Sequence, residues 1–473
     1  MSVVCAGGWV AWAGQHAVKT ERRVNTIAGT GKWSRALLRW VTLISALGYL
    51  HICTAQSHNW VPLSASWGPM RGAVDQSALN SPLTPADTLA VVGRNFMTVG
   101  PDGVSGTPDD KRVRLFGINL GRDACFPPVS KAAGVATTLR SLGFNAVRLH
   151  QMDTTPSRSP EEFVSSLTSG PYPSMHAGAM ERLRHFIQQL NANGIYVNVN
   201  LMVGYVFRPD IDGVPALDTN GTAPGYGSPV HVFYPQMVDK QVEYAQKLLG
   251  ALNLRNEPAL AQVEIINESS LAFAWLHWDK TYWEQQIKGE YARELSAQWN
   301  KWVGDKYGDM NAACQSWKSC ESETKQMLTP AQADALQHTI STGWWLRLKQ
   351  KFNAWLAQVW VAIGMPPRNS KIEIELHPKV RDTLEFVAET DKRFVEKMRA
   401  VVRAATRPNM PVTGTQIDFG APLNFHSHGA MDYVDSHFYV DHPVFPGQAW
   451  SDSDWHFHNE TVSGREIDRK SVV

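Results

Sequence analysis

The chain has few cysteines and no excess of charge of either sign. Its 45 Lys and Arg residues balance 44 Asp and Glu residues, which gives a formal net charge of +1. A near-neutral chain has no basic footprint for nucleic acid, so we expect no nucleic-acid partner. The 5 cysteines among 473 residues suggest neither a disulfide framework nor a metal cluster. Cys314 and Cys320 form a disulfide or remain two thiols; the sequence leaves both open.

A long apolar run is lacking as well. The apolar stretch at residues 41–55 is shorter than the roughly twenty residues that a membrane-spanning helix needs. It follows the basic segment GKWSRALLRW and ends at a small residue, Ala55, as a secretory signal does. We therefore expect a leader over residues 1–55 and a secreted or periplasmic protein. The alternative is an uncleaved leader that anchors the chain to a membrane.

The rest of the chain has the composition of a globular protein, with 43% apolar residues and 18 Trp. Residues 56–112 read as an N-terminal extension with a hairpin, in which PDGVSGTPDD is a turn at the bottom of the following domain. The acidic spacing of this turn is also faintly like that of a calcium loop. From residue 113 to 473, strand-like segments alternate with amphipathic helices, which indicates a parallel sheet. The six expected strands are residues 112–120, 144–153, 195–203, 262–268, 410–418 and 431–440.

Polar residues at the strand ends favour a (β/α)8 TIM barrel over a doubly wound sheet. In a barrel the C-terminal ends of the strands converge on one face, where active sites lie. No Gly-rich phosphate loop follows the first strand, which weakens the nucleotide-binding alternative. A Trp-rich helical insertion is expected after strand four, over residues 280–386. The polar strand-end residues are Asn119, Arg148, His150, Asn198, Asn200, Asn267, Glu268, Gln416, His437 and Tyr439.

Two Asn-Glu pairs flank the fourth strand. Asn256-Glu257 follows a helix and precedes a proline, so it belongs to the connection at the bottom of the barrel. Asn267-Glu268 directly follows VEII at the C-terminal mouth. We therefore predict that Asn267-Glu268 is the functional pair.

The motifs FGINL, NAVRLH, VEIINES and SHFYVDHP together resemble those of clan A retaining glycoside hydrolases, in particular the family 5 cellulase-like enzymes. The resemblance covers residues 113–446. It implies hydrolysis of β-glycosidic bonds in a poly- or oligosaccharide by double displacement, with a carbohydrate substrate, no cofactor, no metal and no obligate protein partner.

The resemblance also implies residue roles. Glu268 would be the general acid/base, and Asn267 would bind the 2-hydroxyl of the sugar. Tyr439 would orient the nucleophile. Substrate-binding roles would fall to Arg148, His150, His437 and Trp275. Glycosidic cleavage needs a protonated carboxyl for the leaving group and a second carboxylate that attacks the anomeric carbon.

The chain departs from the family pattern at the nucleophile, which belongs on strand seven. About six of eight strands are present, so we expect a C-terminally incomplete barrel whose nucleophilic Glu lies beyond the C-terminus and which is itself inactive. The final letters, DRKSVV, also read like a translated adaptor sequence. Glu375 precedes strand five and Glu460 follows no strand, which makes both poor substitutes.

Two other classes of function remain open. One is a non-catalytic carbohydrate-binding or degenerate barrel. The other is a metal-dependent barrel hydrolase that uses histidines such as His426 and His428, or His456 and His458. No third ligand at suitable spacing accompanies these histidine pairs, so loop histidines are the preferred interpretation.

Overall fold

The computed structural model describes most of the chain after residue 67. The leader, Glu375, Tyr439, Glu460 and Cys320 lie outside the described residues, as does the end of the chain. The described residues are 68–154, 166–168, 170–225, 227–278, 280–318, 325–341, 376–416, 421–437, 444–446, 454 and 456.

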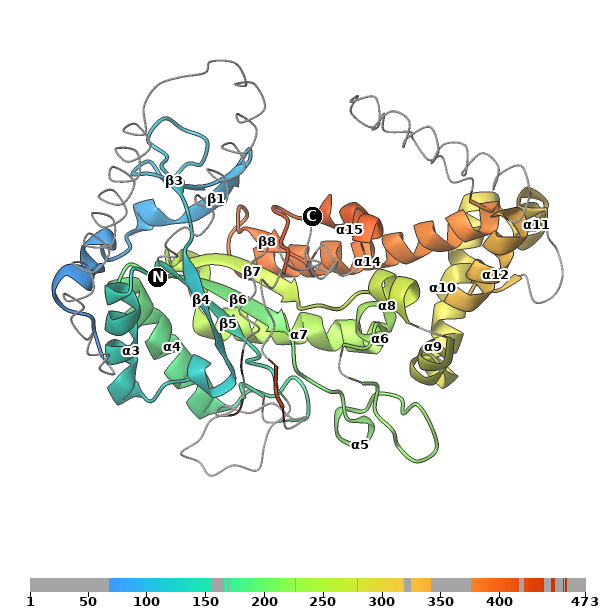
Figure 1. The fold of residues 1–473 in the computed structure, drawn as a ribbon, viewed down its shortest axis with the longest axis horizontal. Helices are drawn as coiled ribbons and strands as arrows, with labels where there is room; N and C mark the ends of the chain where they lie inside the picture. The colour runs from blue at the N-terminus through green and yellow to red at the C-terminus, as the bar shows by residue number, and fades with distance from the viewer. Residues whose placement is uncertain are drawn as a thin grey trace, which may run out of the picture. The chain divides into compact units, whose positions relative to one another are not determined.

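The fold is α/β, with one parallel and one antiparallel sheet (Figure 1). The parallel sheet has the strand order β4-β5-β6-β7-β8. Its strands are β4 (Gly117–Gly121), β5 (Ala146–His150), β6 (Tyr196–Met202), β7 (Leu260–Ile266) and β8 (Val412–Thr413). The antiparallel sheet comprises β1 (Leu89–Val92), β2 (Asn95–Thr98) and β3 (Arg112–Val113).

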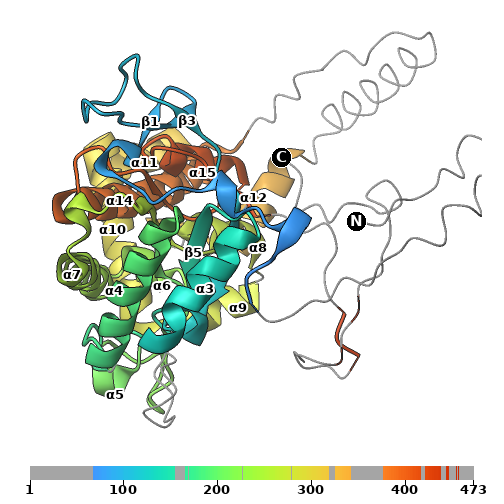
Figure 2. The same ribbon diagram turned by 90° about the vertical axis from the view of Figure 1, so that its left-hand side faces the viewer.

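Helices connect the parallel strands, because parallel neighbours need a long crossover connection. Figures 1 and 2 show α3, α4 and α7 along one side of the parallel sheet. Among the described helices, none combines the length and the apolar character needed to cross a membrane. The described helices are α3 (Val129–Ser141), α4 (Ala177–Ala192), α5 (Pro209–Asp212), α6 (Val230–Phe233), α7 (Pro235–Leu252), α8 (Leu271–His277), α9 (Lys280–Gln286), α10 (Gly289–Tyr307), α11 (Met310–Trp317), α12 (Pro330–Ser341), α14 (Pro378–Ala405) and α15 (Ala421–His428).

The register of the strands gathers polar residues on the face opposite these helices. Asn119 pairs with Arg148, and Arg148 with Asn198. One step further along the strands, Asn200 pairs with Glu264. Because paired residues of neighbouring strands point to the same side of a sheet, these side chains form adjoining polar rows. The intervening apolar residues, such as Val147, Leu149, Val197, Val199, Val263 and Ile265, are buried in the main core.

The N-terminal sheet packs at the beginning of β6 and β7. Leu89, Tyr196 and Ala261 form a small buried cluster there. The Tyr196 hydroxyl also donates a hydrogen bond to the carbonyl of Asp87 over 2.8 Å. The structure thus places the hairpin region at the N-terminal ends of the strands, where the sequence predicts the bottom of the barrel.

Residues 431–437, the described part of the expected sixth strand, are not a strand. They do lie beside β8, because the amide of Asp432 donates to the Val412 carbonyl over 3.0 Å. The ladder goes no further because the Asp432 carboxylate, rather than a backbone carbonyl, accepts from the Val412 amide over 2.9 Å. A side chain has taken a ladder position. Among the described residues the parallel sheet therefore has five strands and remains open, with β4 and β8 at its edges.

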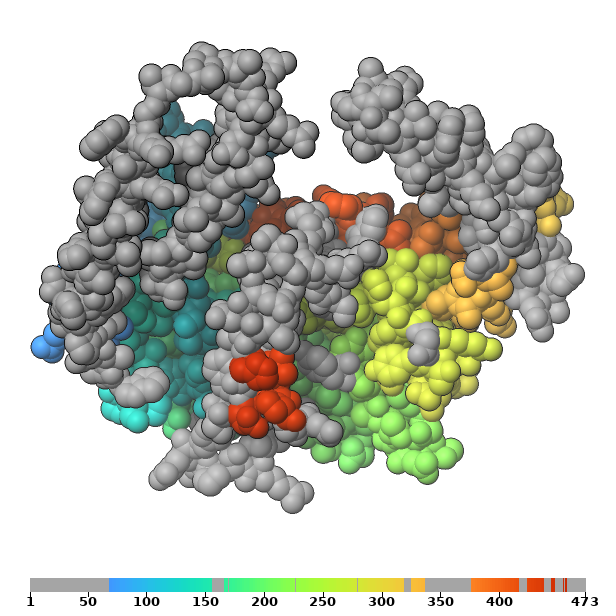
Figure 3. Space-filling model, viewed as in Figure 1, coloured from blue at the N-terminus to red at the C-terminus, as the bar shows by residue number. Residues whose placement is uncertain are grey.

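Helices α9 to α12 form the insertion after the fourth parallel strand. Trp299 and Trp317 stack at 5.8 Å, and Phe386 of α14 meets Trp299 edge-on at 5.4 Å. Helix α14 runs without a break from Pro378, so the expected boundary at residue 386 falls inside one helix. Gln298 of α10 links the insertion to α6 by donating to the Phe233 carbonyl over 2.8 Å. In Figure 3 the yellow surface of the insertion adjoins the green surface of the segment between β6 and β7.

Candidate active site

Asn267 and Glu268 follow directly after the last residue of β7. The amide of Asn267 continues the sheet by donating to the Met202 carbonyl over 2.9 Å. Glu268 then adopts a left-handed backbone with φ 45°, which is uncommon for a residue other than glycine and concentrates at functional sites. Ser270 caps helix α8 by accepting from the Phe273 amide over 2.8 Å. The Asn-Glu pair is thus held in the bend between a strand and a capped helix.

A buried ion pair lies beneath this bend. Arg148 Nε donates to Glu264 Oε2 over 2.7 Å, and Arg148 Nη2 donates to Glu264 Oε1 over 2.7 Å. The same Nη2 donates to Asn267 Oδ1 over 2.8 Å. Burial lowers the pKa of Arg148, but the hydrogen bonds and charge of Glu264 outweigh it and leave that pKa above its ordinary value. The guanidinium therefore stays charged and fixes the amide of Asn267.

Gln416, three residues after β8, links this ion pair to Glu268. Its Nε2 donates to Glu264 Oε1 over 2.6 Å and to Asp435 Oδ2 over 3.0 Å. Its Oε1 accepts from the backbone amide of Glu268 over 2.8 Å. The next amide, that of Ser269, donates to Thr415 Oγ1 over 3.0 Å. Two consecutive side chains after β8 thus hold the left-handed backbone at Glu268.

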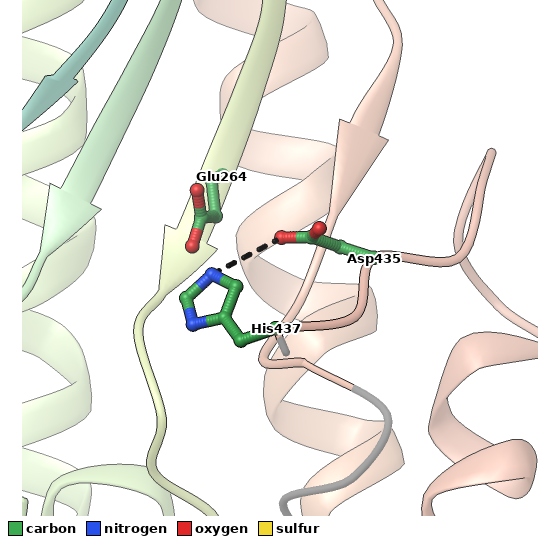
Figure 4. A group of neighbouring side chains, drawn as sticks. All are labelled: Glu264, Asp435 and His437. Atoms are coloured by element: carbon green, nitrogen blue, oxygen red, sulfur yellow. Dashed lines mark ion pairs between the residues drawn. The ribbon is translucent and has the colours of Figure 1, made fainter. Parts of the chain in front are cut away.

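The carboxylate of Glu268 meets His437. The distance between His437 Nδ1 and Glu268 Oε1 is 2.7 Å, and that between His437 Nε2 and Asp435 Oδ2 is 3.9 Å. Burial lowers the pKa of His437, but its hydrogen bond to the Glu268 carboxylate and the charge of Asp435 more than compensate and raise it above its ordinary value. Figure 4 shows Glu264 on β7 reaching toward His437 and Asp435, which come from the segment beside β8.

His150 and Asn200 lie at the ends of the two preceding strands. Asn200 Nδ2 and His150 Nδ1 are 3.3 Å apart. Burial, together with the charges of Arg148 and His437, lowers the pKa of His150 to about 3. His150 is therefore a neutral imidazole whose Nδ1 accepts from Asn200. The pKa of His437, by contrast, is raised.

A cavity of about 320 Å³ opens on the polar face of the sheet. Three side-chain oxygens of its lining are buried without a hydrogen-bond partner among the described residues: Asn198 Oδ1, Gln262 Oε1 and Tyr433 Oη. Arg148 and His437 also line it. Such a set of polar groups suits a ligand that carries several hydroxyl groups.

The structure brings most of the predicted site residues together. Asn267, Glu268, Arg148 and His437 are joined by hydrogen bonds, directly or through Gln416 and Glu264, and His150 lies close to them. Trp275 does not join the group. It is 7% exposed, and its Nε1 donates to the Leu328 carbonyl over 2.9 Å. Trp275 thus packs under the insertion, and its role in substrate binding stays a prediction. Tyr439 lies outside the described residues.

Sequence reasoning missed two carboxylates of the site. Glu264 interrupts the apolar strand VEII, and a fully buried charge needs a partner; this was a signal that could have identified it. Asp435 stands two residues before His437, which places both on one side of an extended segment. Glu264, Asp435 and His437 each offer one ligand atom, and these atoms lie within 4.8 Å of one another. A cation bound there would compete with Arg148 for Glu264.

Comparisons with known proteins give structural similarity without sequence similarity. No protein-family model matches the chain, and no curated protein does. The solved structures with a similar arrangement include an endo-1,4-β-mannanase from Rhizomucor miehei, at 16% identity and a TM-score of 0.28, covering 39% of this chain and 49% of that one. A β-galactosidase from Bacillus circulans sp. alkalophilus matches at 14% identity and a TM-score of 0.38, covering 68% of this chain and 39% of that one. A β-mannanase from the blue mussel Mytilus edulis matches at 13% identity and a TM-score of 0.30, covering 70% and 63%.

This chain thus spans less than two thirds of the length of each of these glycosidases. All three TM-scores are below 0.5.

Proposed function

We propose that this site serves the hydrolysis of β-glycosidic bonds in a poly- or oligosaccharide by the retaining mechanism, with Glu268 as general acid/base. The observation that carries the proposal is the position of Glu268. Its carboxylate stands at the C-terminal end of a central parallel strand, on a left-handed backbone, 2.7 Å from an imidazole whose pKa is raised. Active sites of parallel α/β folds lie at this end of the strands.

The surrounding residues suit the roles proposed for them. Asn267, whose Oδ1 accepts from Arg148, keeps its amide nitrogen for the 2-hydroxyl of the sugar. The 2.7 Å contact between His437 Nδ1 and Glu268 Oε1 orients this carboxyl group, which in double displacement gives a proton to the leaving oxygen and later takes one from water. Arg148 and His437 line the cavity, and His150 supplies a neutral imidazole nearby. Tyr439 keeps its proposed role in orienting the nucleophile.

The attacking carboxylate is not Glu264. Both of its oxygens are hydrogen-bonded by Arg148, and it is fully buried. We propose that the nucleophile lies outside the described residues. This part of the proposal can be tested chemically, because a small anion can replace a missing carboxylate in attacking the anomeric carbon.

The experiment compares Glu268→Gln with Glu257→Gln, which alters the other Asn-Glu pair. Both are assayed with aryl β-glycosides, with and without added azide. Where the nucleophile is lacking, azide forms the new bond to the anomeric carbon, the glycosidic bond breaks, and Glu268 protonates the departing oxygen. The product is an α-glycosyl azide. We expect Glu268→Gln to slow whichever reaction the wild type performs by roughly 10²- to 10⁴-fold for poor leaving groups, with a smaller effect for dinitrophenyl glycosides. Glu257→Gln should retain the wild-type rate.

Two results would contradict the proposal. If neither hydrolysis nor glycosyl azide formation occurs with any β-glycoside, while oligosaccharides bind equally to the wild type and to Glu268→Gln, the chain is a carbohydrate-binding barrel. If the two variants lose activity equally, Glu268 has no special role.

A further inference from the structure

A second cavity lies at the opposite ends of the parallel strands, away from the candidate active site. Its volume is about 550 Å³. It is bordered by residues next to β1 and by the loop that follows α14. Its lining contains two arginines, two asparagines and two threonines, and no carboxylate; the polar members are Thr88, Arg255, Asn256, Thr406, Arg407 and Asn409.

Arg407 is buried in the wall of this cavity, with only 9% of its surface exposed. Its Nη2 donates to the carbonyl of Leu260 over 2.8 Å and to that of Leu89 over 3.1 Å. Its Nε and Nη1 are buried and have no hydrogen-bond partner among the described residues. Two of the three guanidinium nitrogens thus lack the acceptors that a buried charged group needs.

Three half-buried arginines with a carboxylate partner show what Arg407 lacks. Arg148 has the carboxylate of Glu264, and both Arg399 and Arg403 contact the carboxylate of Asp432. Among the described residues, no comparable carboxylate contacts Arg407. Burial lowers the pKa of Arg407 to about 10, and no acid in the described part of the chain opposes that effect.

Asp102, next to the lining residue Gly103, accepts from the amide of Val104 over 2.8 Å. Two further carboxylates adjacent in sequence to lining residues are also engaged elsewhere. Asp87 accepts from the amide and the hydroxyl of Thr84 in a capping box. Glu257 accepts from Asn191 and from the amide of Ala259. Neutralisation of Arg407 by any of these carboxylates would require breaking these hydrogen bonds.

A second cation lies at the exposed rim. Arg255 donates through Nη2 to the carbonyl of Ala404 over 3.0 Å and lines the same cavity as Arg407. The cavity therefore has two positive charges, surrounding amides and hydroxyls, and space for a solute.

We propose that this cavity is a binding site for a small oxyanion, carried as a carboxylate or a phosphate on a soluble ligand. Guanidinium groups match the geometry of both anions and are weakly hydrated, which favours their use at buried sites. The site is separate from the carbohydrate chemistry proposed for Glu268, and its test does not depend on that activity.

The test measures the melting temperature of the full chain against the concentration of inorganic phosphate and, in parallel, of malonate, with sodium chloride added to hold the ionic strength constant. The variants are Arg255→Gln, Arg407→Gln and, as the matched control, Arg184→Gln. Arg184 is also an exposed arginine that donates through Nη2 to a backbone carbonyl, that of Ala251, over 2.8 Å. The oxyanion whose effect on the melting temperature saturates at the lower concentration shows whether the site prefers a phosphate or a carboxylate.

We expect a saturable rise of the melting temperature in the wild type and in Arg184→Gln. Arg255→Gln should raise the half-saturating concentration about threefold, and Arg407→Gln should abolish the saturable part. Phosphate also stabilises proteins through exclusion from their surface, but that effect is common to all four proteins. Equal, non-saturating rises in Arg255→Gln and Arg184→Gln would overturn the proposal, and Arg255→Gln decides the matter even if Arg407→Gln does not fold.

Discussion

The two ends of β7 carry the same dipeptide in different surroundings. Before the strand, Glu257 accepts hydrogen bonds from Asn191 and from the amide of Ala259, so its carboxylate closes a loop. After the strand, the carboxylate of Glu268 faces an imidazole and accepts no hydrogen bond from a backbone amide in the described part of the chain. The Glu257 carboxylate is thus part of the scaffold, whereas the Glu268 carboxylate faces the candidate active site.

The same contrast holds for the arginines at the two ends. Arg148 of β5, on the side of the candidate active site, forms an ion pair with Glu264 of β7 and also donates to Asn267. Arg407, which donates to the carbonyl of Leu260 at the beginning of β7, is buried without a carboxylate partner among the residues that the structure describes. A dipeptide or a residue type therefore does not determine the role; the partners supplied by distant segments do.

The largest effect on stability is expected for Glu264. Replacing Glu264 by Ala leaves the buried side of Arg148 without its counter-charge, and breaking such a pair costs about 3–5 kcal/mol. Glu257→Ala removes hydrogen bonds at the other end of β7 and should cost about 1 kcal/mol. Urea unfolding of both variants measures the free energies of unfolding. A Glu264→Ala cost no larger than that of Glu257→Ala would remove the distinction between the two ends.

The next effect concerns Gln416. Gln416→Ala removes the acceptor of the Glu268 amide and the donor to Glu264 and Asp435, and we expect a loss of about 1–3 kcal/mol. Gln416→Glu restores the acceptor for the Glu268 amide but places a third carboxylate beside those of Glu264 and Asp435. It should therefore be no more stable than Gln416→Ala at neutral pH and should recover on acidification. Unfolding curves at two pH values check this order, and a fully stable Gln416→Glu at neutral pH would contradict it.

Much of this arrangement could be predicted from the sequence, because it depends on local patterns. The position of Asn267-Glu268 after a buried strand follows from VEII, and the location of Asn256-Glu257 on the opposite side follows from the helix before it. The α/β alternation is likewise local. Polar residues spaced two apart, such as Arg148 and His150, correctly indicated the polar side of the sheet.

The remainder depends on contacts between distant segments. Glu264 and Arg148 are 116 positions apart, and the sequence around either residue does not indicate the other as its partner. The sixth strand fails among the described residues because the Asp432 side chain replaces a backbone acceptor. Trp275 follows the Asn-Glu pair closely in sequence, but α8 turns it toward Leu328. Proximity along the chain was a poor guide to proximity at the site.

A smaller effect distinguishes the two histidines at the C-terminal end of the strands. The pKa of His437 is raised in the folded protein, so its contribution to stability is present below the unfolded pKa of about 6.5 and is lost as the pH rises through the folded value. The pKa of His150 is lowered to about 3 in the folded protein. Below about pH 6.5, His150 therefore binds a proton in the unfolded chain but not in the folded one. Stability through His150 therefore falls as the pH drops from about 6.5 toward 3.

The free energy of unfolding of His437→Gln and of His150→Gln, measured from pH 4 to pH 8, checks these signs. His437→Gln should reduce the loss of stability on the alkaline side of the range, and His150→Gln should reduce the loss on the acidic side. Each slope is limited to about 1.4 kcal/mol per pH unit for one proton. Equal pH profiles for the two variants would mean that the histidines do not occupy the opposite environments described for them.

The smallest expected effect is that of a chelator, and it separates the glycosidase proposal from a metal-dependent hydrolase. Glu264, Asp435 and His437 offer three ligand atoms, but Glu264 already binds Arg148 through both oxygens, and the positive guanidinium opposes a second cation at the same carboxylate. We expect EDTA to change neither the melting temperature nor the turnover or azide reaction of a β-glycoside. A loss that zinc or another divalent ion restores in the wild type, but not in Asp435→Asn, would make this cluster a metal centre. The Arg148–Glu264 ion pair would then form only in the metal-free protein. The difference between the surroundings of the two ends of β7 would depend on a bound metal ion rather than on Arg148.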